Sequence, residues 1–507
     1  MNINQIKTKK PFRRIAPDLL AGFSIIAINT GESVVAQTPR ETYSIVSQSE
    51  FLRDYYPSGH KIHDPSYYAD RIKTDDKGNK YMHFVERVAF DMQQVITTKQ
   101  LTHLCGNPIE FTNSDTKKGT SQQSILNDFK QLWIKKNMEI AWYEAAKSEK
   151  ITGDAALVGY FDENKEFGCR VFSYLNEEVL LTHYDSVTGK LSMFGRLYKR
   201  YDVDGESVMD EVLEVWTKTD VTTYVKSIGG SSSMRRISNN IRRFFTDEWS
   251  IEGEPRLHGF PFLPVAYKRN EQGACWSPVQ SCIDQYEKAV SQLCENNKIS
   301  AFRILYLQGD DIDIQYDSTG TPTAIVGEKE TDAKYLERAD VSTAFETQLK
   351  ILTQNIFQGT FTVLPPEVKG GDLAGVTIKL LYSPAIEKAI TEAKEWDGFI
   401  DQTVKIFKTG CGIESKKSFN FESLDVKGEI KPYVHQNDME IINNINSSVL
   451  AGSLSYETAG EIHPYRAINE VDRIQKEARE KVAAQVQEYD NESGMNDNNM
   501  AKQLIEN

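Results

Sequence analysis

The fold is decided by the stretch from Trp276 to Gly410, which opens with WSPVQSCIDQYEKAVSQL (residues 276–293). A Ser-Pro pair followed by apolar residues at three- and four-residue spacing is the pattern of a helix start and one apolar helical face. The residues on this face are Val279, Cys282, Ile283, Tyr286, Val290 and Leu293. We therefore predict a first helix within residues 273–301.

A short β insert separates this first helix from a second one. Residues 304–314 alternate in polarity, residues 317–322 (DSTGTP) form a turn cluster, and residues 324–326 return as a strand. The helical period then resumes within residues 341–359, which we predict to be the second helix. Its apolar face consists of Phe345, Leu349, Leu352 and Ile356.

Residues 361–375 (FTVLPPEVKGGDLAG) cannot continue this helix, because they contain two prolines and three glycines. A helical pattern resumes at residue 376, and a helix from there to Phe407 would be about 48 Å long at 1.5 Å per residue. Its apolar positions extend further than the neighbouring elements of one chain would obviously cover. Identical chains packed head to tail would cover them, and a rotation that closes produces a ring.

The chain before this stretch predicts mixed structure. Residues 1–80 combine a basic arm, a short apolar run and a section rich in Tyr, Asp and Ser, and residues 85–104 and 125–147 predict two helices. A strand period follows, with hairpin signals at residues 185–189 and 202–205. The predicted strands are residues 155–161, 168–175, 178–184, 190–201, 208–217 and 222–226. Short consecutive strands form an antiparallel meander, so the predicted fold class is α+β.

Size, charge and cysteine content bound the class of protein. The chain has 507 residues, of which 39% are hydrophobic and 26% charged, which is typical of a soluble globular protein. Its net charge of −14 argues against wrapping of DNA, and fits either simple solubility or a channel through which DNA slides without sticking. The six cysteines contain no CxxC pair, so we expect buried thiols and a reducing cytoplasm.

Membrane insertion and export are not favoured. No run of 18 apolar residues occurs, so we expect no membrane-spanning helix. Basic residues within 9–14 precede an apolar run at residues 19–27, which has the outline of a secretory signal. Asp18 and Glu32 interrupt that outline, and they favour a buried or docking segment behind a basic arm.

Motifs for catalysis and for metal or nucleotide binding are weak. The sequence contains no G-x-x-x-x-G-K-[ST], G-x-S-x-G or H-E-x-x-H, so we expect no catalytic residue, metal or cofactor. His60, His63 and Asp64 could hold a metal, but without a second cluster a solvated loop is favoured. The aspartates within residues 310–313 lack the spacing of a calcium loop and favour a hairpin tip.

One basic segment follows a Gly/Ser-rich joint at residues 229–233. Two arginine pairs seven residues apart would share one helical face, where they could contact phosphate or an acidic neighbouring subunit. A mobile, solvated segment is the favoured interpretation. The four residues are Arg235, Arg236, Arg242 and Arg243.

In this order, the landmarks resemble the portal proteins of tailed bacteriophages, in the siphovirus-type family. Residues 258–265 (HGFPFLPV) resemble the strand that precedes the stem, and residues 276–286 resemble the start of the first stem helix. Residues 363–379 resemble the proline-then-glycine tunnel loop and the helix after it, and residues 452–459 (GSLSYETA) resemble the start of the crown. The resemblance covers residues 81–482 and leaves the first 80 residues unplaced.

The resemblance implies a ring subunit with an antiparallel β wing, two stem helices around a small α/β clip, a tunnel loop, a long wing helix and a helical crown. It assigns the extension to residues 1–80, the wing to 81–272, the stem to 273–301 and 341–359, the clip to 302–340, the tunnel loop to 360–375, the long wing helix and its return to 376–436, the crown to 437–488, and a disordered tail to 489–507. Two sets of site residues follow. The stem set is Val279, Ile283, Tyr286, Val290, Phe345, Leu349, Leu352 and Ile356. The DNA-facing tunnel loop set is Val363, Leu364, Pro365, Pro366, Glu367, Lys369, Gly370, Gly371 and Asp372.

The function that the resemblance implies is a channel at the unique capsid vertex, through which double-stranded DNA is packaged and later ejected. The implied partners are further copies of the chain in a dodecamer, the terminase large subunit, the head–tail adaptor, the major capsid and scaffolding proteins, and DNA held without sequence preference. Such a protein is assembled in the host cytoplasm, is part of the virion, contacts no membrane and is not an enzyme. The alternatives are another head–tail structural protein, such as an adaptor, and a metal-dependent hydrolase built on His60, His63 and Asp64.

Overall fold

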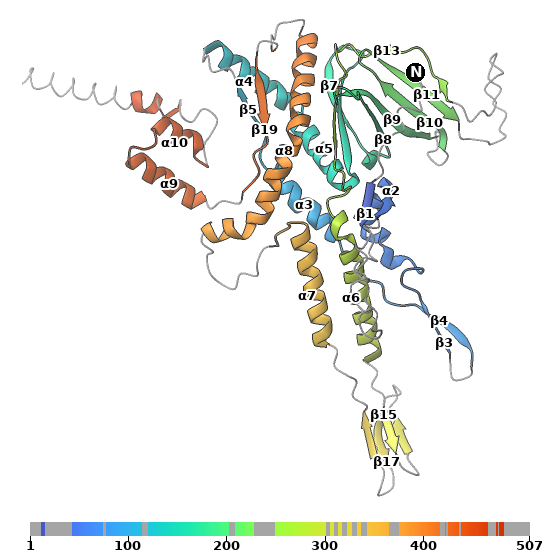
Figure 1. The fold of residues 1–507 in the computed structure, drawn as a ribbon. Helices are drawn as coiled ribbons and strands as arrows, with labels where there is room; N and C mark the ends of the chain where they lie inside the picture. Colours follow the sequence, from blue (N-terminus) through green and yellow to red (C-terminus); the bar gives the residue numbers. More distant parts are fainter. Residues whose placement is uncertain are drawn as a thin grey trace, which may run out of the picture. The chain divides into compact units, whose positions relative to one another are not determined.

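The structure is a computed structural model that describes residues 12–15, 43–74, 78–113, 120–201, 208–227, 249–300, 305–308, 313–316, 322–326, 332–335, 342–364, 375–415, 421, 424–434, 438–464, 473–474 and 476–480. Helices and antiparallel sheets alternate along these residues, as Figure 1 shows. The chain divides into two compact units, residues 1–366 with 384–433 and residues 367–383 with 434–507. The α+β class predicted from the sequence is confirmed.

The first unit begins with short elements and then forms helices around small sheets. Its early elements are β1 (Phe12–Ile15), β2 (Tyr43–Val46), α2 (Gln48–Tyr55), the 3-10 turns η2 (Pro57–Gly59) and η3 (Lys61–His63), β3 (Arg71–Thr74), β4 (Lys80–His83), α3 (Met92–Cys105) and β5 (Glu110–Asn113). The helices α4 (Thr120–Lys135) and α5 (Met138–Thr152) follow. A single helix over residues 125–147 was predicted and is wrong, because Asn137 adopts a left-handed conformation with φ of 56° and separates the two helices.

Part of the predicted β meander is present. The strands at residues 155–161 and 168–175 were predicted to belong to it, and this is wrong, because they form a second sheet with β14 (Val265–Arg269). The strands β8 (Val179–Tyr184), β9 (Leu191–Tyr201), β10 (Val208–Trp216) and β11 (Asp220–Ser227) pair antiparallel in sequence order, and β12 (Ser250–Ile251) and β13 (Arg256–Leu257) pair with β11. The second sheet has the order β14, β6 (Asp154–Phe161) and β7 (Phe167–Phe172), and the turn η4 (Tyr174–Asn176) leads from it. Phe172, Phe194 and Trp216 belong to the apolar cluster between the two sheets.

The long helix α8 (Gly375–Glu414) closes the main core of the first unit. Aromatic side chains from three helices meet there, with the rings of Trp133 and Phe407 5.1 Å apart and those of Trp142 and Trp396 4.7 Å apart. The sequence predicted that the elements of one chain would not cover all the apolar positions of this helix. From Ala385 to Cys411 most of its apolar residues are buried against α3, α4, α5 and the β14-β6-β7 sheet. Leu380, Leu381, Ile390 and Ile413 are exposed, which agrees with the prediction.

The two predicted helices around the β insert are present close to their predicted limits. The first consists of the turn η5 (Ser277–Val279) and α6 (Gln280–Ser300), and the second is α7 (Ser342–Gly359). Between them lie β15 (Leu305–Gln308) paired with β18 (Asp332–Tyr335), and β16 (Asp313–Tyr316) paired with β17 (Pro322–Val326). The helices α6 and α7 pack against each other (Figure 1).

The end of the chain contributes one strand to the first unit and helices to the second. β19 (Val426–Glu429) pairs with β5 in the first unit. The second unit contains α9 (Asp438–Leu450) and α10 (Tyr456–Ile462), which fall within the residues predicted for a helical crown. The Ser455 hydroxyl accepts a hydrogen bond from the Thr458 amide at 3.1 Å and caps α10.

Candidate functional site

The helices α6 and α7, which the resemblance assigns to the stem, are joined by a small apolar cluster at one end. Trp276, Val279 and Ile283 of the first helix and Ile356 of the second are all buried in it, and the ring of Tyr55 stacks on Trp276 at 5.7 Å. The other predicted stem residues, Tyr286, Val290, Phe345, Leu349 and Leu352, are half-buried. The structure therefore brings the predicted stem residues together as one helix pair, and their place around a channel stays a prediction.

A second face of α6 is polar and equally buried. Asp284, Glu287, Ser291 and Glu295 recur every three or four residues, and none is more than 8% exposed. Sequence reasoning missed this face, because acidic residues at helical spacing usually face water. The only sequence signal was the regular placement of these residues beside the apolar face.

The segment that covers this polar face is the N-terminal strap, which we define as residues 54–74 and 78–91. His60 Nδ1 lies 2.6 Å from Glu287 Oε1, and His83 Nε2 lies 2.6 Å from Glu295 Oε1. The Val88 amide donates to Ser291 Oγ at 2.9 Å, and the Phe90 amide donates to Glu287 Oε1 at 2.9 Å. The sequence left the first 80 residues without a role, and the structure gives this part of them a place along α6.

This arrangement favours the charged form of His60. Its Nδ1 faces the carboxylate of Glu287, and its Nε2 lies 2.8 Å from the carbonyl oxygen of Asp54, so both nitrogens donate only when the ring is protonated. Burial lowers the pKa of His60, but the hydrogen bond and charge of Glu287 outweigh this and raise it above 6.5. The hydrogen bond from His83 likewise holds the pKa of Glu295 below 4.5.

The solvated loop predicted for His60, His63 and Asp64 is wrong for one of its three members. His60 is only 3% exposed, because its side chain points toward Glu287 of α6 and the neighbouring Ile62 is also buried. His63 and Asp64 are exposed. Both ring nitrogens of His60 have partners, which leaves neither for a metal. Within the part of the chain that the structure describes, no group of three or more His, Cys, Asp or Glu side chains could hold a metal ion.

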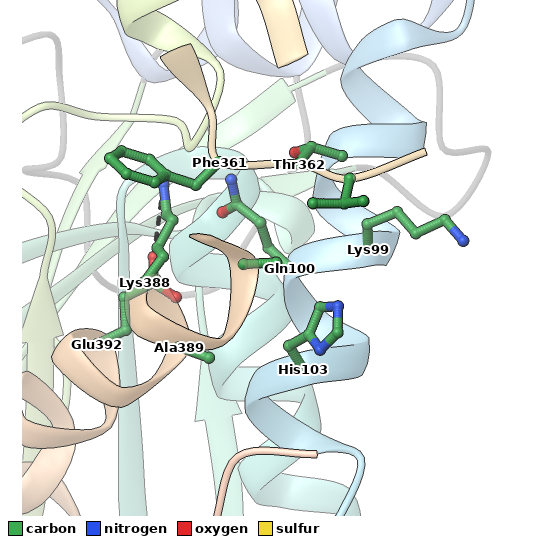
Figure 2. A pocket seen from close by; sticks show the side chains of 10 residues that line it. Lys99, Gln100, His103, Phe361, Thr362, Lys388, Ala389 and Glu392 are labelled. Carbon is green, nitrogen blue, oxygen red and sulfur yellow. Dashed lines mark ion pairs between the residues drawn. The ribbon is translucent and has the colours of Figure 1, made fainter. Parts of the chain in front are cut away.

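The start of the predicted tunnel loop is anchored by hydrogen bonds to α3 and α7. Gln100 Nε2 donates to the Thr360 carbonyl at 2.9 Å, and the Thr362 amide donates to the Phe357 carbonyl at 2.8 Å. Between the two buried threonines, Phe361 has a φ of 55° and turns its ring outward, toward Lys388 of α8 (Figure 2). This strained residue reverses the chain at the end of α7, so that Val363 and Leu364 leave the helix in a fixed direction.

Charged side chains from α5 and α8 form a network beside this anchor. Lys150 Nζ lies 2.5 Å from Glu392 Oε1, and Lys388 Nζ lies 3.8 Å from the same oxygen. Burial raises the pKa of Glu149 to about 7 and lowers the pKa of Lys388. Glu149 and Lys388 also line an open cavity of about 880 Å³ with Lys268 and Trp396. The network fixes α8 to α5 next to the beginning of the loop.

The remaining predicted site residues lie outside the described residues. They are Pro365, Pro366, Glu367, Lys369, Gly370, Gly371 and Asp372 of the tunnel loop, the arginines 235, 236, 242 and 243, and the aspartates 310 and 311. The N-terminal arm before residue 43, apart from β1, and the polar tail after residue 480 lie outside them as well. No helix within the described ranges combines the length and the apolar character that a membrane crossing requires.

The sequence matches a known protein family over most of its length. The family is described as phage portal protein, SPP1 Gp6-like, and the match covers residues 41–484. A comparison with curated proteins found no match. The family match begins 40 residues before the resemblance drawn from the motifs, and it includes the whole N-terminal strap. The chain therefore belongs to the phage portal proteins of the SPP1 Gp6-like family.

Proposed function

We propose that this chain forms the ring-shaped channel at the unique capsid vertex, through which double-stranded DNA is packaged and later ejected. Portal proteins are structural components of the phage capsid and act as ring oligomers, and we infer a dodecamer here. The observation that carries the proposal is the α6–α7 pair followed by an anchored loop start and the long helix α8. The helix pair leads into a loop whose start is held by hydrogen bonds. Such an arrangement would keep the pore-facing segment of each subunit at the same position along the channel axis.

The parts of the subunit take the roles predicted for them. Residues 81–272 and 376–436 form the wing, the helices within 273–301 and 341–359 form the stem, and residues 437–488 form the crown. The clip, residues 302–340, docks the terminase large subunit during packaging and the head–tail adaptor afterwards. The major capsid and scaffolding proteins surround the wing and crown during assembly in the host cytoplasm. The described clip strands pair antiparallel, which supports a compact docking module.

DNA passes the tunnel loop, residues 360–375, without being bound tightly. Lys369 is the only cation in that loop, and Glu367 and Asp372 offset it, so the loop braces DNA by shape more than by charge. The net charge of −14 also disfavours neutralisation of many phosphates. The arginines at 235, 236, 242 and 243 are the alternative phosphate contact, and their other role would be contact with a neighbouring subunit.

Electron microscopy of the purified full-length protein tests the proposal. We expect closed rings with a central hole, because a head-to-tail contact that closes by rotation produces cyclic symmetry. Monomers alone, or open filaments without closed rings, would contradict it.

A change in the loop tests its role separately. Lys369→Ala should leave the number and size of rings unchanged, since a loop that faces the channel makes no contact between subunits. Packaging, measured as DNA protected from nuclease in an assembly reaction, should change by less than about tenfold, because one surface charge contributes about 1 kcal/mol or less. If the rings fail to form, the loop is an assembly element instead.

A further inference from the structure

The β3–β4 hairpin of the N-terminal strap has one face against its own chain and one face in solvent. Its register pairs Arg71 with His83 and Ile72 with Met82. Directly paired residues point to the same side of a hairpin, and the next pair points to the other side. Because His83 contacts Glu295 of α6, the side that carries Ile72 and Met82 faces away from α6.

The outward side of the hairpin is unusually apolar for a small exposed sheet. Ile72 is 68% exposed, Met82 is 53% exposed, and Phe84, which follows β4, is 71% exposed. A two-stranded hairpin is marginally stable without further packing, and three large apolar side chains in water make it less so. We call this surface, formed by Ile72, Met82 and Phe84, the hairpin face.

The second stem helix presents a different exposed surface. An open, shallow surface runs along α7, and Ile351 within it is 52% exposed. It is lined by Thr343, Ala344, Thr347, Gln348, Ile351 and Leu352. These positions carry no charge, and the exposed Glu346 and Lys350 lie along their edge. Exposed helix faces are normally charged, so a side of small, amide and aliphatic residues suits close contact with another apolar surface. We call this surface the α7 face.

The two faces lie at the same level of the stem. Val279 at the beginning of the first stem helix lies beside Gly359 at the end of α7, so the two helices run antiparallel. The last turns of α6 are therefore level with the first turns of α7. The hairpin is tied to those last turns by the contact of His83 with Glu295 and by the ion pair of Lys298 with Glu86, at 2.6 Å each.

The two faces also lie on different sides of the stem. Figure 1 shows α7 on one side of α6 and the hairpin on the other, all within the first unit. A closed ring needs a heterologous contact, in which one patch of a subunit meets a different patch of the next. Rotation about the ring axis preserves height, so two patches at one level on opposite sides satisfy this requirement.

We propose that the hairpin face of one copy docks on the α7 face of the next copy around the ring. This inference rests on the proposed function, since it assigns the contact by which the stem closes into a ring. It also gives each stem helix its cover: the strap of the same chain covers α6, and the strap hairpin of the neighbour covers α7. The other occupant of the α7 face would be DNA in the channel. The exposed Ile351 and the charges of Glu346 and Lys350, which offset each other, favour the protein.

Disulfide trapping tests the contact in assembled rings. The double variant Met82→Cys with Thr343→Cys, oxidised after assembly, should give a ladder of covalent multimers on denaturing gels, because Thr343 in the first turn of α7 is level with Glu295 of α6. The matched control is Tyr81→Cys with Thr343→Cys. Tyr81 is 50% exposed but pairs with Lys73, so its side chain points to the opposite side of the hairpin from Met82. Two cysteines whose Cβ vectors point apart cannot be bridged without movement of the backbone. The single variants measure crosslinking by the chain's own six cysteines.

The possible outcomes separate the inference from the proposed function. If the wild-type chain forms rings but the double variant gives no ladder, the docking contact is overturned and the ring proposal stands. The same holds if the Tyr81 control gives an equally strong ladder. Rapid alkylation of Ile351→Cys by a maleimide in assembled rings overturns it as well, and assigns the α7 face to the open channel. A wild-type chain that forms no rings overturns the proposed function, and this inference falls with it.

A second variant tests the energetics. Ile72→Asp with Met82→Asp should raise the protein concentration needed for ring formation by about tenfold or more, because burial of even one large apolar side chain contributes about that factor. Val187→Asp is the control, since Val187 is 91% exposed at the turn between β8 and β9. Equal assembly of the two variants, both folded by circular dichroism, contradicts the proposal.

Discussion

The two stem helices differ in how their own chain covers them. α6 has an apolar face in the cluster around Ile283 and a polar face under the N-terminal strap, and both faces are buried. α7 is covered on the side of Ile356, while Ile351 and its neighbours remain in solvent. Among the described residues, both faces of the first helix are covered, whereas no described element covers the side of the second helix that carries Ile351. On our proposal, that side is the one that a neighbouring copy covers.

The largest expected effect is on the apolar face of α6. Ile283→Ala should lower the free energy of unfolding by about 4 kcal/mol, because the side chain is fully buried and its removal leaves a cavity. Ile351→Ala, the same substitution on α7, should change it by less than about 0.5 kcal/mol in the unassembled chain. The thermal unfolding midpoints of the monomer fractions measure both. Similar losses for the two variants would mean that α7 is covered within one chain after all.

The strap gives the next effect. His60→Ala should destabilise the contact between the strap and α6 by about 3 kcal/mol, because Glu287 would stay buried without its charged partner. His63→Ala is the matched control, since His63 lies in the same turn and is exposed. Hydrogen exchange of the amides of Val88 and Phe90 reports the opening of the strap. Unchanged protection in His60→Ala would show that the strap is held by its other contacts.

The same contact predicts a smaller dependence on pH. The pKa of His60 is raised in the folded protein, so its stabilisation is complete below pH 6.5 and is lost as the pH rises through the folded pKa. The pKa of Glu295 is lowered, so its stabilisation is present above pH 4.5 and is lost as the pH falls through the folded pKa. Exchange at Val88 should therefore be slowest between pH 4.5 and 6.5, after correction for intrinsic exchange. In His60→Ala the loss at higher pH should disappear.

The sequence predicted the apolar packing of α6 and missed the polar contacts of α6 with the strap. The apolar face of α6 follows from the spacing of Val279, Ile283 and Tyr286 alone, so the helix and its packing side were predictable. The polar face was not, because Glu287 meets His60 from a part of the chain more than 200 residues away. A contact between residues so far apart in the sequence cannot be predicted from a local pattern. Asp, Glu and Ser at helical spacing are also typical of solvent-exposed faces, so the sequence did not predict that this face is buried.

The helices α4 and α8 show two other differences between the sequence prediction and the structure. The break between α4 and α5 depends on the left-handed conformation of Asn137, which a helical period on both sides of it concealed. The cover of the middle of α8 was not predictable, because Trp133 meets Phe407 and Trp142 meets Trp396 across helices that are far apart in the sequence, and aromatic side chains bury a large surface. By contrast, the limits of α7 and the order from β8 to β11 depend on local signals and were predicted closely. The sheet of β6 and β7 was not, because its third strand β14 comes from a distant part of the chain.

The smallest expected effect compares one hydroxyl on each stem helix. Ser291→Ala should lower the protection of the Val88 amide by about 1 kcal/mol, because that amide loses its acceptor at 2.9 Å in a place where water has little access. Thr353→Ala on α7 removes a hydroxyl that donates to the Leu349 carbonyl of its own helix at 2.8 Å. The Leu349 carbonyl still accepts the hydrogen bond of its own helix, so the free energy lost in Thr353→Ala should be smaller than the free energy lost in Ser291→Ala. A larger free-energy loss in Thr353→Ala would contradict the conclusion that the strap covers and stabilises α6.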